Sequence, residues 1–235
     1  MKKIALMALT LFSLMGCSST AYNEESTVES MKRVQNHAGL IEHYKARLEQ
    51  KSNDVQVMQD LAFAYLAKED VESAKFYFQH LSELGVENAR LAQLGGQVHS
   101  LEGEDALALE QYQRSIAMGN SSGEIQVLTG IAYSNLGEFS LAIRAFNQAR
   151  LKGFNDVAIK NNLAVVYLAQ QQYHDVIALL APVYQENQSN EKVRSNLAIA
   201  FFKVGEVSQA KELLEALFLI RKLRKYPKRF IDKKR

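Results

Sequence analysis

The chain has 235 residues, of which 47% are hydrophobic and 23% charged, so it holds enough apolar material for a sizeable core. Ten tyrosines, eleven phenylalanines and only two prolines argue against a disordered chain. A single cysteine excludes an internal disulfide and a cysteine-rich metal site. The formal net charge is +2, yet residues 221–235 hold nine lysines and arginines against one aspartate. The body is therefore acidic and the tail basic, which is not the pattern of a nucleic-acid groove.

The N-terminal residues are organised like a secretory signal. Lys2 and Lys3 precede an apolar run from Ile4 to Met15, whose twelve residues are too few to cross a bilayer as a helix. The run leads into Leu14-Met15-Gly16-Cys17, which resembles the bacterial lipobox, although Met15 replaces the small residue often found there. The resemblance implies removal of residues 1–16 and acylation of Cys17.

Acylated Cys17 would carry a thioether-linked diacylglycerol and an N-terminal acyl chain, and such a pair of signals anchors a protein stably. Ser18 follows the cysteine where an aspartate would be the alternative, which resembles the outer-membrane sorting rule. We therefore expect a lipid-anchored protein on the periplasmic face of the outer membrane. The alternative is an ordinary signal peptide that happens to contain a cysteine.

Five columns of residues keep their character every 34 positions, without insertion or deletion. One column is small throughout: Ala62, Gly96, Gly130, Ala164 and Ala198. Another is mainly aromatic: Tyr65, His99, Tyr133, Tyr167 and Phe201. Further columns begin at Ala74, Phe78 and Glu69. With helical spacing inside each repeat, this period predicts helix–turn–helix repeats that start near residues 55, 89, 123, 157 and 191.

The columns have a mechanical interpretation. Small residues let two antiparallel helices approach closely, and the aromatic columns fill the seam beside them. The turn column that begins at Glu69 contains Gly103, Gly137 and Gly205, which favour the backbone angles that end a helix. A second column between repeats holds Gly85, Gly119, Gly153 and Asn187, and it predicts left-handed helix stops.

The pattern resembles the tetratricopeptide repeat family. Leu61-Ala62 with Tyr65, and Ala142 with Phe146, match its motif. The family's tryptophan and its terminal proline are missing, and Val176 and Leu180 replace alanine and an aromatic residue in the fourth repeat. The resemblance covers about residues 55–222. It implies an all-α fold, a right-handed α-solenoid of about five repeats.

The rest of the chain divides around this solenoid. Residues 1–16 are the expected signal peptide. Residues 17–36 are polar and are expected to be a lipid anchor and tether, with a helix that begins within Val28–Val34. Residues 37–54 are expected to form an N-terminal helix or a degenerate repeat, because Tyr44 lies one repeat period before Phe78. Residues 223–235 form a basic C-terminal tail.

The sequence contains no motif of a catalytic centre. It has no glycine-rich phosphate loop, no His-Glu-x-x-His and no Gly-x-Ser-x-Gly. The five histidines are widely spaced, and His99 occupies the tyrosine column, which favours packing over metal binding. We expect no enzymatic activity, no cofactor, no metal and no small-molecule substrate.

The family resemblance implies that the first helices of the repeats line a concave binding face. Asn162 and Asn196 occupy a column in which family members hydrogen-bond a ligand backbone, and Asn161 stands beside them. An apolar floor is expected from Phe63, Ile131, Val165 and Ile199. This face would suit an amphipathic helix or an extended segment of a protein partner. The alternative is that these residues only pack against neighbouring helices.

The basic tail is a second candidate site, for anionic lipid or an acidic partner. Its cations are Arg221, Lys222, Arg224, Lys225, Lys228 and Arg229, followed by three more at the end of the chain.

Three segments resemble a narrower group. Asn161-Asn-Leu-Ala164, Ile177-x-Leu-Leu-x-Pro182 and Val193-Arg-x-Asn-Leu-Ala198 resemble the TadD family, lipoproteins of tight-adherence (Flp) pilus assembly. The resemblance implies a pilotin-like or scaffolding factor whose partner is a secretin or another pilus subunit. Two alternatives stay open: another envelope repeat lipoprotein, of the type IV pilus pilotin class or a protease adaptor, and a partner of cell-wall enzymes.

Overall fold

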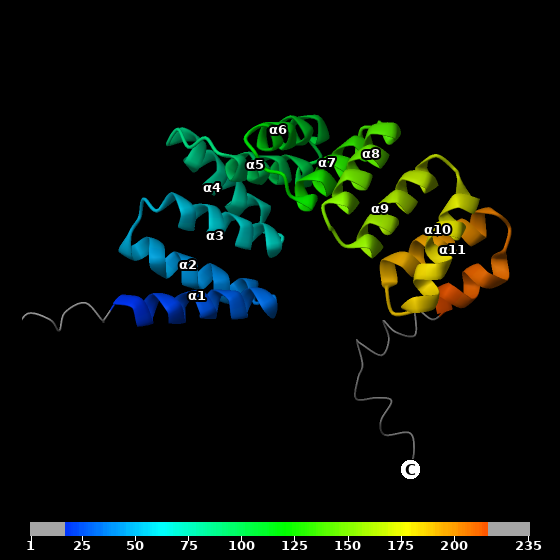
Figure 1. The fold of residues 1–235 in the computed structure, drawn as a ribbon, viewed down its shortest axis with the longest axis horizontal. Coiled ribbons are helices and arrows are strands. Elements are labelled where there is room, and N and C mark those ends of the chain that lie inside the picture. Colours follow the sequence, from blue (N-terminus) through cyan, green and yellow to red (C-terminus); the bar gives the residue numbers. More distant parts are fainter. Residues whose placement is uncertain (1–16, 216–235) are drawn as a thin grey trace, which may run out of the picture. The chain divides into compact units, whose positions relative to one another are not determined.

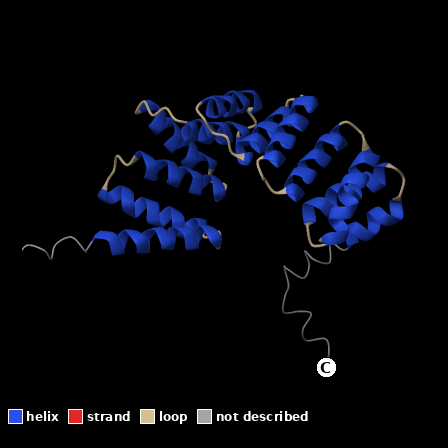
Figure 2. Cartoon of the chain, in the orientation of Figure 1, coloured by secondary structure: helices blue, strands red, loops and turns tan. Residues whose placement is uncertain are grey.

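The computed structural model describes residues 17–215, and its regular structure within them is helical throughout (Figures 1 and 2). The all-α fold class is thereby confirmed. Two compact units divide the chain, Met1–Leu101 and Glu102–Arg235, and they are called unit 1 and unit 2 below. The expected signal peptide and the cations of the basic tail lie outside the described residues. Among the described helices, none is long and apolar enough to cross a membrane.

Antiparallel helix pairs build both units. Unit 1 contains α1 (Cys17–Arg33), α2 (His37–Gln50), α3 (Val55–Ala67), α4 (Val71–Glu83) and α5 (Ala89–Leu101). Unit 2 contains α6 (Asp105–Ala117), α7 (Gly123–Asn135), α8 (Phe139–Leu151), α9 (Asp156–Ala169), α10 (Tyr173–Glu186) and α11 (Glu191–Lys203). Another helix begins at residue 207 and reaches residue 215, where the described residues end. Helix starts follow the period of the sequence columns.

Side-chain caps explain where the first helix of a pair begins. Asp54, Asn88, Ser122 and Asn190 occupy equivalent positions of the repeat, and each accepts a hydrogen bond from the backbone N–H three residues further on. Such a bond satisfies one of the donors that a helix start leaves free. These caps place four of the first helices at the same point of their repeats, whereas Asn155 caps α9 one residue earlier.

Residues with positive φ end the first helix of each pair. They form one column at the repeat spacing: Gln35, Glu69, Gly103, Gly137, Gln171 and Gly205. The three that are not glycine, Gln35, Glu69 and Gln171, have φ of 54°, 64° and 61°. An L-residue is strained in this region, so the tight turn imposes the conformation even where the sequence lacks glycine.

The N-terminal residues correct one expectation. Residues 17–36 were expected to start as a tether, with a helix that begins within Val28–Val34, but α1 already starts at Cys17 and ends at Arg33. Val28 and Met31 lie one repeat period before Ala62 and Tyr65, and both pack against the core of unit 1. The helix forms because Val28 and Met31 bury apolar surface against this core, as their equivalents Ala62 and Tyr65 do in the next repeat. Together with Gln35 in the turn, α1 and α2 form a further pair in register with the repeats.

A second correction concerns the stop at Asn187. Gly85, Gly119 and Gly153 have φ of 73°, 97° and 78°, as the glycine column predicts. Asn187 was expected to be left-handed, but it ends α10 in an extended conformation, with φ −143° and ψ 91°. Its side-chain Oδ1 accepts bonds from both the backbone N–H and the hydroxyl of Ser189. That local bonding favours a different turn from the one glycine makes.

The cores lie in the seams between helices, as the small columns predict. Ala74, Ala108 and Ala142 are fully buried. A Cβ added at Gly130 would stand only 2.6 Å from the Phe146 ring, so the ring rests directly on the α7 backbone. The small columns are therefore steric requirements of the helix pairs.

Candidate functional site

The first helices of unit 2 lie side by side. Helix α9 contacts both α7 and α11, so residues at equivalent positions of the repeat form rows that run across the three helices. We call this surface the first-helix face. It comprises Ile131, Asn161, Asn162, Val165, Asn196, Ile199 and Phe202.

One row of the first-helix face is apolar and accessible. Val165 and Ile199 are 45% and 46% exposed, and Ile131 is half-buried beside the core of unit 2. Phe202, which the sequence analysis missed, is 62% exposed and lies one turn beyond Ile199 on α11. Its column reads Leu66, Ser100, Ser134, Leu168 and Phe202, so the aromatic residue at the end of that column was the available signal. The side chains of this row are not fully buried in the cores, so the row leaves an apolar surface accessible for contact.

The row of amides is partly paired within the protein. Asn196 Nδ2 donates a hydrogen bond to Asn161 Oδ1 at 2.9 Å, and both residues are half-buried. Asn162, which shares the repeat column of Asn196, is half-buried on α9. After this bond, Asn196 keeps a carbonyl oxygen and one N–H for a ligand. The neighbouring Ser195 hydroxyl donates to the Glu191 carbonyl at 2.8 Å and is engaged by its own helix.

Phe63 has a different environment from the other predicted floor residues. It lies on α3 in unit 1, where the Arg90 guanidinium stands 5.0 Å from the centre of its ring. Arg90 also forms an ion pair with Asp60, which holds the cation over the ring. The half-buried Phe63 side chain is therefore already in contact with a cation of its own unit.

A carboxylate ties the start of α9 to its neighbours. Asp156 lies 2.8 Å from Lys160 Nζ and 3.0 Å from Arg150 Nε. The Lys160 hydrogen bond holds the pKa of the Asp156 carboxyl below its usual range, and the charges of Lys160 and Arg150 act in the same direction. These exposed pairs stabilise the α8–α9 connection weakly and do not form a catalytic constellation.

One buried cation was not predicted. Arg194 is only 3% exposed, donates to the Gln188 carbonyl, and stands 5.7 Å from the centre of the Tyr184 ring. Its contacts join α11 to α10 and to the turn between them.

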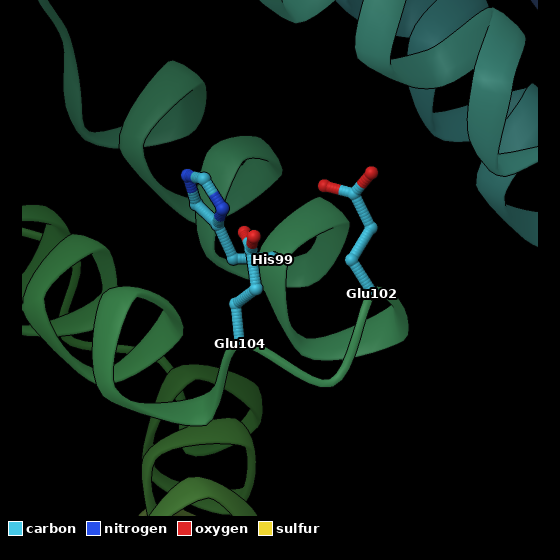
Figure 3. Close-up of side chains that lie close together, drawn as sticks. All are labelled: His99, Glu102 and Glu104. Carbon is cyan, nitrogen blue, oxygen red and sulfur yellow. The ribbon is translucent and has the colours of Figure 1, made fainter.

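Figure 3 shows His99, Glu102 and Glu104, residue types that can bind metals, at the end of α5 and in the turn that follows. The His99 ring packs edge-on against Phe78, with centroids 6.0 Å apart, in keeping with its place in the aromatic column. The two glutamates lie beyond the boundary between the units, in an exposed turn. We assign no ligand to this group.

Comparisons with known proteins agree with the repeat register. Residues 167–223 match the sequence model of the tetratricopeptide repeat. No curated protein matches the chain by sequence.

Three solved structures have a similar fold. PilW, a widely conserved type IV pilus biogenesis factor, is 12% identical, with a TM-score of 0.70 over 91% of this chain and 97% of that chain. TTC0263, a thermophilic tetratricopeptide protein of Thermus thermophilus, is 16% identical, with a TM-score of 0.63 over 77% and 98%. Pseudomonas aeruginosa pilF is 18% identical, with a TM-score of 0.55 over 68% and 73%.

The helix pairs and the open first-helix face define the class: a helical-repeat scaffold for protein–protein interaction. The 34-residue register and the fold are those of tetratricopeptide-repeat structures, and residues 167–223 match the sequence model of that repeat. This fold is typically non-catalytic and binds protein or peptide partners.

Proposed function

We propose that the chain is a lipid-anchored, non-enzymatic adaptor on the periplasmic face of the outer membrane. In this proposal it assists assembly of a tight-adherence (Flp) pilus secretion machine. Its partner is the secretin or another pilus subunit, bound through the first-helix face of unit 2.

The observation that carries the proposal is the composition of the first-helix face. Val165, Ile199 and Phe202 leave about half or more of their surfaces exposed, beside the amides of Asn162 and Asn196. Apolar side chains next to half-buried amides suit a peptide segment, because the amides can bond its backbone while the apolar row holds its side chains. The sequence has no convincing match to the basic residues that clamp a C-terminal carboxylate in some proteins of this repeat family, so we favour an internal segment of the partner.

Two features of the sequence support the membrane location and the pilus role. The Leu14-Met15-Gly16-Cys17 lipobox and Ser18 support acylation and outer-membrane sorting. The segments around Asn161, Pro182 and Asn196 resemble the TadD family.

The structural similarity favours a second candidate within the same class. PilW is described as a type IV pilus biogenesis factor, and its structure matches 91% of this chain. A type IV pilus role is therefore the alternative to the Flp role, with the same kind of binding face and anchor.

A quantitative pull-down from outer membranes tests the proposal. Acylated wild-type protein is compared with an Asn162→Ala, Asn196→Ala variant and with an Asn147→Ala, Gln148→Ala control on the exposed surface of α8. Quantitative mass spectrometry measures Flp secretin, type IV secretin and pilin in each eluate. We expect enrichment of the Flp secretin or another Flp subunit with the wild type and the control, and loss by about tenfold or more with the amide variant. Enrichment of type IV components alone favours the second candidate, and enrichment of none overturns both.

A further inference from the structure

Helix α4 of unit 1 carries an exposed apolar stripe. Phe76 is 61% exposed and Leu84, at the C-terminal end of the helix, is 52% exposed. His80 lies between them, with its ring stacked on Phe76 at a centroid distance of 6.1 Å and an interplanar angle of 7°. Spacing by four residues puts all three on one side of the helix. We call these three residues the α4 stripe.

The repeat register shows that packing does not require an aromatic residue here. The positions equivalent to Phe76 in the other pairs are Glu42, Glu110, Arg144, Ala178 and Glu212, and all of them are exposed. This column therefore faces solvent throughout the described repeats. A phenylalanine in a solvent-facing column buries no surface in the core, so an exposed aromatic residue here indicates a contact with a partner.

The charges around the stripe indicate what it can bind. Glu72 lies one turn before Phe76 and Glu83 one residue before Leu84, and both are exposed. An aromatic face bordered by carboxylates suits a guanidinium, which stacks on the ring while it pairs with the acid. Unit 1 already contains this arrangement, because Arg90 stands over Phe63 and pairs with Asp60.

A segment of matching chemistry is present in the same chain. Residues 221–235 hold nine cations against one acid, and four of the cations are arginines. Leu223, Tyr226, Phe230 and Ile231 lie among them and can supply apolar contacts. We propose that the α4 stripe binds the basic C-terminal segment, residues 221–235, of a second copy of this chain. This contact would link adaptors to one another through residues other than those of the first-helix face.

Fluorescence anisotropy tests the contact directly. A labelled synthetic peptide of residues 221–235 is titrated with the full chain in non-ionic detergent, over protein concentrations that extend above those at which the wild type associates. Phe76→Ser removes the ring, and Glu110→Ser is the matched control, because Glu110 occupies the equivalent position one repeat later. We expect Phe76→Ser to weaken peptide binding about tenfold and Glu110→Ser to leave it within about twofold.

Two further measurements distinguish this contact from general charge attraction, and a third checks that the variants are folded. A peptide with lysine at every arginine position keeps its charge but loses stacking, and we expect it to bind more weakly. Sedimentation velocity of the full chain should show association that rises with concentration and is lost in Phe76→Ser. Thermal melts establish that both variants are folded.

Equal binding by Phe76→Ser and the wild type would overturn the proposal, as would the absence of binding. So would a peptide that binds vesicles of anionic phosphatidylglycerol and not the protein, because the tail would then be a lipid contact.

Discussion

Asn196 on α11 donates a hydrogen bond to Asn161 on α9 across the boundary between two repeats, at 2.9 Å. The two residues are 35 positions apart, so they belong to neighbouring columns of the repeat and not to the same one. Because this bond is half-buried, it both stabilises the stacking of the first helices and orients an amide on the candidate binding face.

Asn196→Ala should therefore lower the free energy of unfolding by about 0.5–1.5 kcal/mol, the usual net value of one neutral hydrogen bond. Asn161→Ala should do the same, and the double variant should cost less than the sum because the second change removes no further bond. Urea denaturation of the four proteins measures this coupling. Strictly additive losses would show that the bond contributes nothing in solution.

Ala142→Phe should destabilise the array by about 1–3 kcal/mol or more, because Ala142 is fully buried and a larger side chain has no space. Gln148→Ala, on the exposed surface of the same helix, should change stability by no more than about 0.5 kcal/mol. Thermal melts of the pair give the comparison. Equal melting temperatures would contradict the packing of α8.

Gln171→Gly should stabilise the protein. Gln171 has φ of 61°, in the left-handed region where an L-residue is strained by about 1–2 kcal/mol. Glycine has no such strain, so the substitution should raise the free energy of unfolding. The greater entropy of glycine in the unfolded chain offsets part of this gain. Gly137→Ala introduces the same strain at φ 78° and should destabilise. Differential scanning calorimetry of both variants checks the opposite signs. A lower melting temperature for Gln171→Gly would mean that its side chain makes a contact worth more than the strain.

Asp156→Asn should lower stability at neutral pH and have little effect in acid. The folded-state pKa of this carboxyl lies below the ordinary value of 3.8, mainly through the Lys160 hydrogen bond. Its stabilisation is therefore fully present above that value and is lost as the pH falls through the folded-state pKa. Because Asp156 is half exposed, we expect no more than about 0.5 kcal/mol. Melting temperatures of both proteins at pH 7 and pH 3 measure the difference, which should shrink at the lower pH.

Cys17→Ser should release the protein from membranes without unfolding it, because one sulfur carries the proposed anchor and serine differs from cysteine only by oxygen in place of that sulfur. Membrane fractionation and mass spectrometry of the N-terminal peptide provide the readouts. A wild-type protein without lipid, together with a variant that still sediments with outer membranes, would exclude the lipobox interpretation.

The sequence by itself determined the all-α repeat class, the small columns and most of the glycine stops, because these follow from spacing along one helix or within one turn. Tertiary structure decided the rest. Residues 17–33 are helical because Val28 and Met31 meet an apolar seam. Asn161 became the partner of Asn196, and Arg90 came to lie over Phe63. Such pairings depend on how neighbouring helices are shifted and rotated against each other, which a column of equivalent positions does not specify.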